Sequence, residues 1–357
     1  MRPPVITLRE RNIMRKIKIP VSSIGFAVIL GRECNLDCKY CVQKHMHKQQ
    51  APKKKRIEDI IRYLRDARSK SDENMILSFY GGEPLIYYDD MKRLSNELEG
   101  FDFLLTTNGL LLTKEKVDFL NETYFDVMVS YDGKQSKEVR GFDPVSDRRK
   151  ELIAINDLSI HTVLKSGSSY AETLQKLEDF NAEYRSLHGY DIKISFAPIV
   201  PFSGESGYCA SDYKRDLKQI LSNAGDNLLA RQYFNRLKNQ LENAVNGCHP
   251  TNLLDKNCRY GTMIPISMDG DIYACLNRDH VVANIDDPIK FAMEKIAEVN
   301  MTERMKRCKE CFFNGVTCKN AGCPIQSDDV FEQYCSEAKD RGTALLEVLD
   351  EISQKGL

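Results

Sequence analysis

Short apolar runs alternate with amphipathic stretches along the first half of the 357-residue chain. Runs of about five apolar, β-branched or aromatic residues predict buried strands, and apolar residues repeating every three or four positions predict the helices that cover them. Strands that alternate with helices are typical of a parallel α/β fold. The predicted strands are Phe26–Leu30, Met75–Tyr80, Phe101–Thr106, Phe125–Ser130, Ile160–Leu164 and Ile192–Ala197.

Six strand–helix units are too few to close an eight-stranded barrel, so the pattern predicts a partial (β/α)6 TIM-like barrel. Chemistry in such folds lies at the carboxyl ends of the strands. Polar segments that contain glycine follow three of the predicted strands, at Gly81–Pro84, Thr106–Gly109 and Ser130–Gly133. We therefore expect a functional site at this edge of the sheet.

The pattern changes near residue 200 to Pro, Gly and Ser, which is typical of a linker. A helical stretch follows, and eight of the twelve cysteines lie between Cys248 and Cys335. The expected organisation is an N-terminal segment at 1–22, the barrel at 23–205, a helical linker at 206–247, a small cysteine-rich domain at 248–340 and a C-terminal helix at 341–357.

Charge and hydropathy bear on the partners and the cellular compartment of the protein. Lys and Arg number 51 against 52 Asp and Glu, so nothing in the charge balance favours a nucleic-acid or membrane partner. We find no signal peptide and no apolar stretch of about 20 residues that would span a bilayer, which predicts a cytoplasmic protein. The cytosol keeps thiols reduced, so cysteines at short spacings indicate metal ligands or catalytic groups rather than disulfides.

Cys34, Cys38 and Cys41 follow the first predicted strand within eight residues. Three thiolates can bind one iron–sulfur cluster, and a cluster with four irons would keep one iron open for another ligand. One alternative is a zinc site completed by His45 or His47, because structural zinc usually has four protein ligands. Three unrelated core thiols are the other alternative.

The C-x3-C-x2-C spacing, with Tyr40 before the last cysteine, resembles the signature of the radical S-adenosylmethionine (SAM) superfamily. The resemblance implies a [4Fe–4S] cluster on the three cysteines and SAM at its open iron, with Tyr40 near the adenine. The sequence Gly81-Gly82-Glu83-Pro84 resembles the motif of this family after the second strand, which receives the SAM amino group. Glycines permit close backbone approach, and a carboxylate pairs with an ammonium group.

Polar residues after the next two strands resemble positions that line the SAM pocket in this family. Ser130 would meet the ribose or the carboxylate of SAM, and Arg140 would meet the carboxylate. Strand-end turns and a solvated arginine are the alternatives, because Asn, Asp and Gly also suit turns for backbone reasons. The implied pocket residues are Asn108, Ser130, Asp132 and Arg140.

The later cysteines resemble the SPASM domain, a C-terminal extension of many radical SAM enzymes that modify peptides. Two gaps in the motif, Cys311-x6-Cys318 and Cys318-x4-Cys323, are each one residue longer than usual. The resemblance implies two auxiliary [4Fe–4S] clusters, and with the first cluster three in total. A structural zinc ion on Cys308, Cys311, Cys318 and Cys323 is the alternative, and Cys209 is interpreted as a free thiol. The implied ligands are Cys258, Cys275, Cys323 and Cys248 for one cluster, and Cys308, Cys311, Cys318 and Cys335 for the other.

The resemblance implies an oxidoreductase that generates a 5′-deoxyadenosyl radical and abstracts hydrogen from a peptide or protein substrate. We expect a thioether or carbon–carbon crosslink in a ribosomally synthesised peptide, with an electron donor such as flavodoxin or ferredoxin as a partner. If the peptide has a leader, either a separate leader-recognition protein or the short N-terminal segment would hold it. The alternatives are an anaerobic sulfatase-maturating, formylglycine-generating enzyme and a non-catalytic Fe–S or zinc-binding interaction protein. Sulfatase maturases often carry an acidic residue after the cysteine that corresponds to Cys275. Leu276 stands there, and the candidate base Asp279 follows three positions later.

Overall fold

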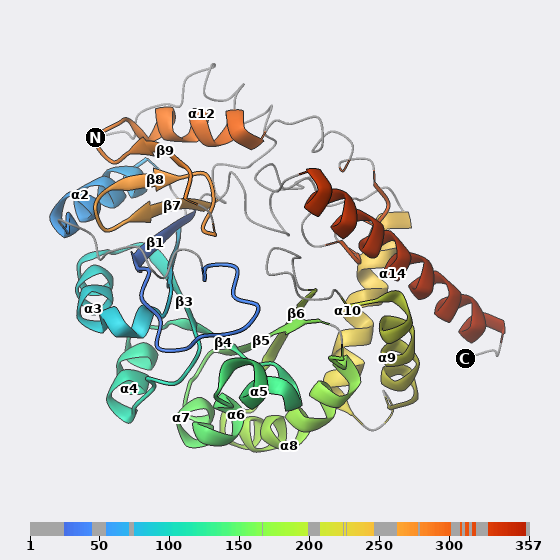
Figure 1. Ribbon diagram of the computed structural model, residues 1–357. Helices are drawn as coiled ribbons and strands as arrows, with labels where there is room; N and C mark the ends of the chain where they lie inside the picture. Colours follow the sequence, from blue (N-terminus) through green and yellow to red (C-terminus); the bar gives the residue numbers. More distant parts are fainter. Residues whose placement is uncertain are drawn as a thin grey trace.

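A curved sheet of nine strands forms the frame of the computed structural model (Figure 1). The described residues are 25–44, 55–70, 75–165, 167–198, 208–223, 225, 227–245, 263–277, 279–300, 308, 311–313, 316–318 and 328–354. Within them the strand order is β6-β5-β4-β3-β2-β1-β7-β8-β9. The strands are β1 Gly25–Gly31, β2 Met75–Gly81, β3 Phe101–Thr107, β4 Asp126–Ser130, β5 Leu158–Leu164, β6 Lys193–Pro198, β7 Met263–Ser267, β8 Asp271–Tyr273 and β9 Val281–Asn284.

The first six strands are parallel and lie side by side in chain order, which confirms the predicted partial barrel. Helices follow the strands and cover the outer face of the sheet, as Figure 1 shows. In the barrel they are α2 Ile57–Arg68, α3 Tyr88–Glu97, α4 Lys114–Glu122, α5 Ser136–Arg140, α6 Pro144–Asp147, α7 Arg149–Ile153 and α8 Tyr170–His188, with 3-10 turns η2 Pro84–Tyr87 and η3 Gly133–Gln135.

The two faces of the sheet differ in chemistry. Apolar side chains point outwards under the helices, and Phe79, Phe103 and Phe125 stack there with ring centroids 5.2–6.2 Å apart. Burying each such ring stabilises the fold by about 1.5–3 kcal/mol. Successive strand residues alternate between faces, so Ser130 and its register partner His161 belong to the inner face. The concave side is therefore polar near the carboxyl ends of the strands.

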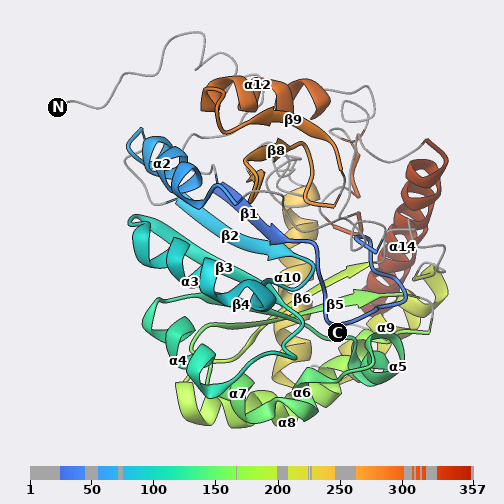
Figure 2. The ribbon, with the colours of Figure 1, turned by 60° about the vertical axis from the view of Figure 1, so that its left-hand side comes forward.

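The sheet continues past β1 into the C-terminal half of the chain. β7 pairs with β1 in parallel, and β8 and β9 add antiparallel strands that α12, Ile289–Asn300, covers. The turned view in Figure 2 shows β8, β9 and α12 on the side of β1 that lies opposite β2. The hydrophobic pattern did not predict β7 and β8, because Pro265 interrupts the apolar run of β7 and β8 is only three residues long.

Helices α9, Ala210–Asn223, and α10, Leu228–Val245, follow the barrel, and α14, Asp328–Gln354, packs on α9. Ion pairs Lys214–Glu347 (2.7 Å) and Lys218–Glu351 (2.6 Å) join α9 to α14. α14 begins earlier than the expected helix at 341–357, because the buried stripe that includes Phe331 already requires a helix. In the described part of the chain, no helix has the length and apolar character of a membrane span.

Candidate functional site

Two glycines bring the end of β2 against the chain that leaves β1. Gly82 N–H donates to the Gly31 carbonyl (3.1 Å), and Glu83 N–H donates to the Glu33 carbonyl (2.8 Å). A Cβ on Gly82 would lie 2.1 Å from Glu33 O, and Gly81 has a φ of 142° that side chains rarely adopt. Only glycine fits this approach. The motif after β2 therefore fixes the backbone directly before Cys34.

Glu83 joins the ends of β2 and β3. Its side chain is buried, with Oε1 accepting from Thr107 Oγ1 (2.7 Å) and Leu85 N (3.0 Å), and Oε2 accepting from Asn108 N (2.7 Å). Burial raises the pKa of this carboxyl, whereas these hydrogen bonds act in the opposite direction. A carboxylate has about four acceptor positions, so room remains for an ammonium group. The sequence did not reveal that Glu83 also holds its neighbours in place.

The three cysteines of the first loop lie close enough for their charges to interact. Burial, the largest cause, raises the pKa of each thiol, and that of Cys38 to about 11. Asn108 Nδ2 lies 3.9 Å from Cys34 Sγ and donates to Asn35 Oδ1 (2.8 Å). Sequence reasoning missed Asn35, although it lies between two predicted ligands.

This donor set fits an iron–sulfur cluster, because a cation that binds the thiolates would compensate charges that burial disfavours. Each thiolate of a [4Fe–4S] cluster binds a different iron. The sulfurs accordingly need not surround one point, and no group of three His, Cys, Asp or Glu in the described ranges is arranged around a single ion.

Tyr40, Asp132 and Arg140 form a buried polar cluster beside Cys38. Asp132 Oδ2 accepts from Tyr40 Oη and from Arg140 Nε, both at 2.5 Å, and Arg140 also donates to Tyr40 Oη. The side chains of Arg140 and Asp132 are 8% and 3% exposed, so this is a buried ion pair. Arg140 Nη1 lies 3.9 Å from Cys38 Sγ. Burial raises the pKa of Tyr40 well above its usual value, so its hydroxyl keeps the proton that it donates.

His161 lies on the inner face of β5, opposite Ser130 in the register. Burial lowers the pKa of its imidazole to about 4, and the nearby Arg140 guanidinium acts in the same direction. Nδ1 is enclosed and has no hydrogen-bond partner. Sequence reasoning did not select His161, although a polar residue at an inward-facing strand position was the signal for it.

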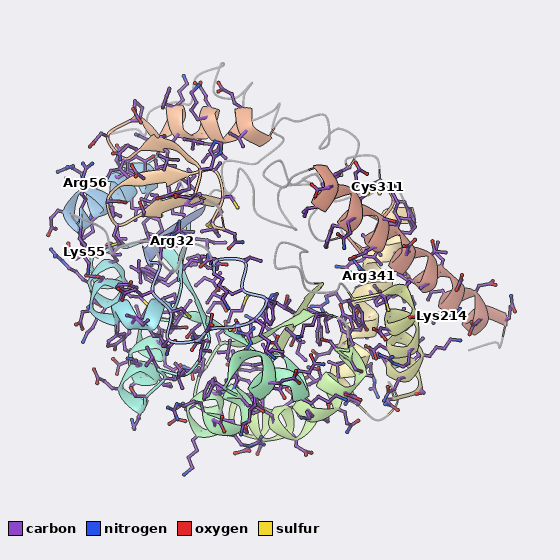
Figure 3. The ribbon with its side chains drawn as sticks, viewed as in Figure 1. Arg32, Lys55, Arg56, Lys214, Cys311 and Arg341 are labelled. Carbon is purple, nitrogen blue, oxygen red and sulfur yellow. The ribbon has the colours of Figure 1, made fainter. Side chains whose placement is uncertain are left out.

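Four of the predicted auxiliary ligands line one small common cavity. Figure 3 labels Cys311 near the upper end of α14. The aromatic side chains Phe313, Phe331 and Tyr334 complete most of the wall. The cysteines that line this cavity are Cys308, Cys311, Cys318 and Cys335.

The other predicted residues lie apart from these clusters or outside the residues that the structure describes. Cys275 is partly buried after β8, whereas Cys248, Cys258 and Cys323 lie outside the described residues. The carboxylate of Asp279 is exposed on the connection from β8 to β9. Cys209 is exposed, and its Sγ lies 3.1 Å from Ser211 Oγ.

Comparisons with known proteins agree with this geometry. Residues 28–183 match the model of the radical SAM superfamily. The radical SAM cyclopropyl synthase TigE of Paramaledivibacter caminithermalis is 22% identical over 179 residues, covering 45% of this chain and 37% of the relative. The serine-type anaerobic sulfatase-maturating enzyme of Bacteroides thetaiotaomicron is 29% identical over 189 residues, covering 48% and 45%. These matches thus span less than half the length of each relative.

Two solved structures share the fold across most of the chain. One is hexahistidine-tagged anSMEcpe with bound AdoMet, with a TM-score of 0.64 and 17% identity, covering 92% of this chain and 98% of that one. The other is Streptococcus suis SuiB bound to the precursor peptide SuiA, with a TM-score of 0.60 and 19% identity, covering 88% and 75%. At these identities the likeness shows a common fold: a partial barrel with a C-terminal SPASM domain.

Proposed function

Because residues 28–183 are a radical SAM domain, we propose that the protein is a radical SAM enzyme that crosslinks a ribosomally synthesised peptide. With SAM and its iron–sulfur cluster bound, such a site supplies a 5′-deoxyadenosyl radical that abstracts hydrogen from a C–H bond. The observation that carries the proposal is the convergence of the Cys34–Cys41 loop, the Gly81-Gly82-Glu83 turn and the Tyr40–Asp132–Arg140 cluster at one edge of the sheet.

The residues of the chain have separate roles in this proposal. Cys34, Cys38 and Cys41 hold the cluster, and Arg140, 3.9 Å from Cys38 Sγ, supplies positive charge beside it. The Arg140 guanidinium and the hydrogen-bonding groups near Asn108 and Ser130 would orient the carboxylate and ribose of SAM. The polar inner face around Ser130 and His161 would line the space that the reacting part of the peptide enters.

The C-terminal cysteines would hold two auxiliary [4Fe–4S] clusters. The common cavity of Cys308, Cys311, Cys318 and Cys335 supports one of them, and Cys275 would be a ligand of the other. A peptide substrate is consistent with SuiB, a structure of the same fold that has a precursor peptide bound. An electron donor such as flavodoxin or ferredoxin and a separate leader-recognition protein complete the proposed set of partners.

Sulfatase maturation is the second candidate, and the likeness to the Bacteroides enzyme favours it. A general base must reach the proton that it removes. Leu276 follows Cys275, and the Asp279 carboxylate three positions later is exposed, so the acidic residue expected directly after this cysteine is absent.

The proposed function is tested by anaerobic reconstitution with iron and sulfide, followed by an assay for 5′-deoxyadenosine with SAM and reductant. We expect about twelve irons per chain and SAM cleavage, because three [4Fe–4S] clusters hold four irons each. The Cys311→Ala variant should lose about four irons and still cleave SAM, and Cys209→Ala, which removes an exposed thiol, serves as the control. No iron and no cleavage would overturn the proposal, and modification of a sulfatase peptide alone would favour the second candidate.

A further inference from the structure

Side chains from the barrel converge on the turn that follows Cys275. Gln43, two residues after Cys41, donates through Nε2 to the Leu276 carbonyl (3.2 Å) and to Asn277 Oδ1 (3.0 Å). Tyr80, on β2, donates its hydroxyl to the same Asn277 Oδ1 (3.1 Å). The first cysteine loop and the Cys275 turn are thus connected directly, although more than 200 residues separate them in the chain.

Arg32 adds a third contact from the end of β1. Its Nη1 donates to the Leu276 carbonyl (3.2 Å), and its guanidinium lies 5.4 Å from the centre of the Tyr273 ring. Figure 3 labels Arg32 between β1 and the C-terminal strands. Arg32 is 9% exposed and Gln43 only 4% exposed. Buried hydrogen bonds of this kind hold one geometry, because breaking them leaves polar groups without partners.

The turn itself points a donor at the cysteine. The backbone N–H of Asn277 donates to Cys275 Sγ at 3.3 Å. Hydrogen bonds to the sulfurs help set the reduction potential of an iron–sulfur cluster, because they stabilise the additional negative charge of the reduced form. The side chain of Asn277 is held by Gln43 and Tyr80 while its backbone faces the sulfur.

We propose that Gln43 and Tyr80 are positioning residues that hold Asn277 so that its N–H faces Cys275, and that the first cysteine loop thereby raises the reduction potential of the auxiliary cluster bound at Cys275. The inference rests on the proposed function in taking Cys275 as a ligand. It adds a specific route by which the two cysteine loops are coupled. If these contacts served only to dock the turn, removing them would leave the reduction potential of the cluster unchanged.

The test compares Gln43→Leu, Tyr80→Phe and the double variant with wild type. Gln232→Leu is the matched control, because the side chain of Gln232 donates to Asp191 Oδ2 (2.7 Å) on the exposed surface, far from any predicted ligand in the sequence. Hydrogen exchange of residues 275–277 is first measured before iron is added. Anaerobic redox titration of the reconstituted protein, followed by electron paramagnetic resonance, then gives the potential of each cluster, and added SAM identifies the first cluster.

We expect faster hydrogen exchange at 275–277 in Gln43→Leu. At a fixed potential, the ratio of reduced to oxidised auxiliary cluster should be about tenfold lower, which corresponds to a reduction potential lower by about 59 mV for a one-electron couple. Tyr80→Phe should have a smaller effect, and the two changes should not add, because both donors serve one oxygen. Potentials equal to those of Gln232→Leu would overturn the inference alone, even if exchange became faster. Wild-type protein that loads no auxiliary iron would overturn the proposed function, and the inference with it.

Discussion

The close approach of Gly82 to the chain before Cys34 predicts a large effect from one methyl group. In Gly82→Ala, the new Cβ would lie 2.1 Å from Glu33 O, 2.5 Å from Glu33 C and 2.6 Å from Arg32 O. All three are backbone atoms, so no side-chain rotation can relieve the contacts. The segment that leads into Cys34 must move by about 1 Å to restore van der Waals distances.

The cost of this movement has two parts. Overpacking in a closely packed site costs about 1–3 kcal/mol. The hydrogen bonds from Gly82 N to Gly31 O and from Glu83 N to Glu33 O would lengthen, and each is worth about 0.5–1.5 kcal/mol. Together they predict a loss of about 3 kcal/mol, which for a chain of this size lowers the unfolding midpoint by about 4 °C. The displaced loop should also bind its cluster poorly.

The assay is thermal unfolding of the iron-free protein, with iron counted after reconstitution. Gly225→Ala is the control, because a Cβ on Gly225 has nothing within 4 Å. We expect Gly82→Ala to lose about four irons and SAM cleavage, and Gly225→Ala to match wild type. If Gly82→Ala keeps the midpoint and the iron of the control, the close approach does not position the cysteine loop and the reasoning is refuted.

Two further predictions concern buried charge. Asp132→Asn leaves the Arg140 guanidinium buried without its counter-ion, so the free energy of unfolding of the iron-free protein, measured in urea, should fall by about 3–5 kcal/mol. The control Asp118→Asn, in the exposed pair with Lys114, should cost less than about 1 kcal/mol. Equal losses in the two variants would contradict a buried pair. The imidazole of His161 has a pKa of about 4 in the folded protein, below its value of about 6.5 in the unfolded chain, so the unfolded chain binds the proton first as pH falls below 6.5 and stability decreases until about pH 4. Wild type should lose at most about 3 kcal/mol relative to His161→Gln over this window, and parallel urea stability curves for the two proteins would exclude the effect.

The barrel was predictable because its strands obey simple patterns. The predicted run Met75–Tyr80 became Met75–Gly81, and Phe101–Thr106 became Phe101–Thr107, since the apolar residues there meet helices that the same pattern reveals. β7 and β8 were missed for a physical reason. The parallel partner of β7 is β1, about 240 residues earlier in the chain, and no local periodicity records such a long-range pairing. β8 pairs with its chain neighbours β7 and β9, but its three residues are too few to show a period.

The candidate site also has parts that the sequence predicts and parts that it does not. Short spacings identify Cys34, Cys38 and Cys41 as a group, and the chemistry of glycine explains the turn after β2. The structural role of Glu83 depends on Thr107 and Asn108 of another strand, and the junction of Gln43 with Asn277 depends on the docking of the C-terminal strands. Such contacts arise from the tertiary fold, so sequence spacing does not reveal them.

The position of β1 between β2 and β7 has a consequence for the order of events during synthesis. Gly25 pairs with Met263, about 240 residues later, and at ~5–20 residues per second the ribosome needs roughly 10–50 s to make that stretch. Until then the edge of β1 that pairs with β7 lacks that strand, and an edge left open invites wrong pairings. The contacts of Arg32 and Gln43 with Leu276 form only after β7 has docked. The first cysteine loop of the nascent chain therefore reaches its final environment only when more than three quarters of the protein has been made.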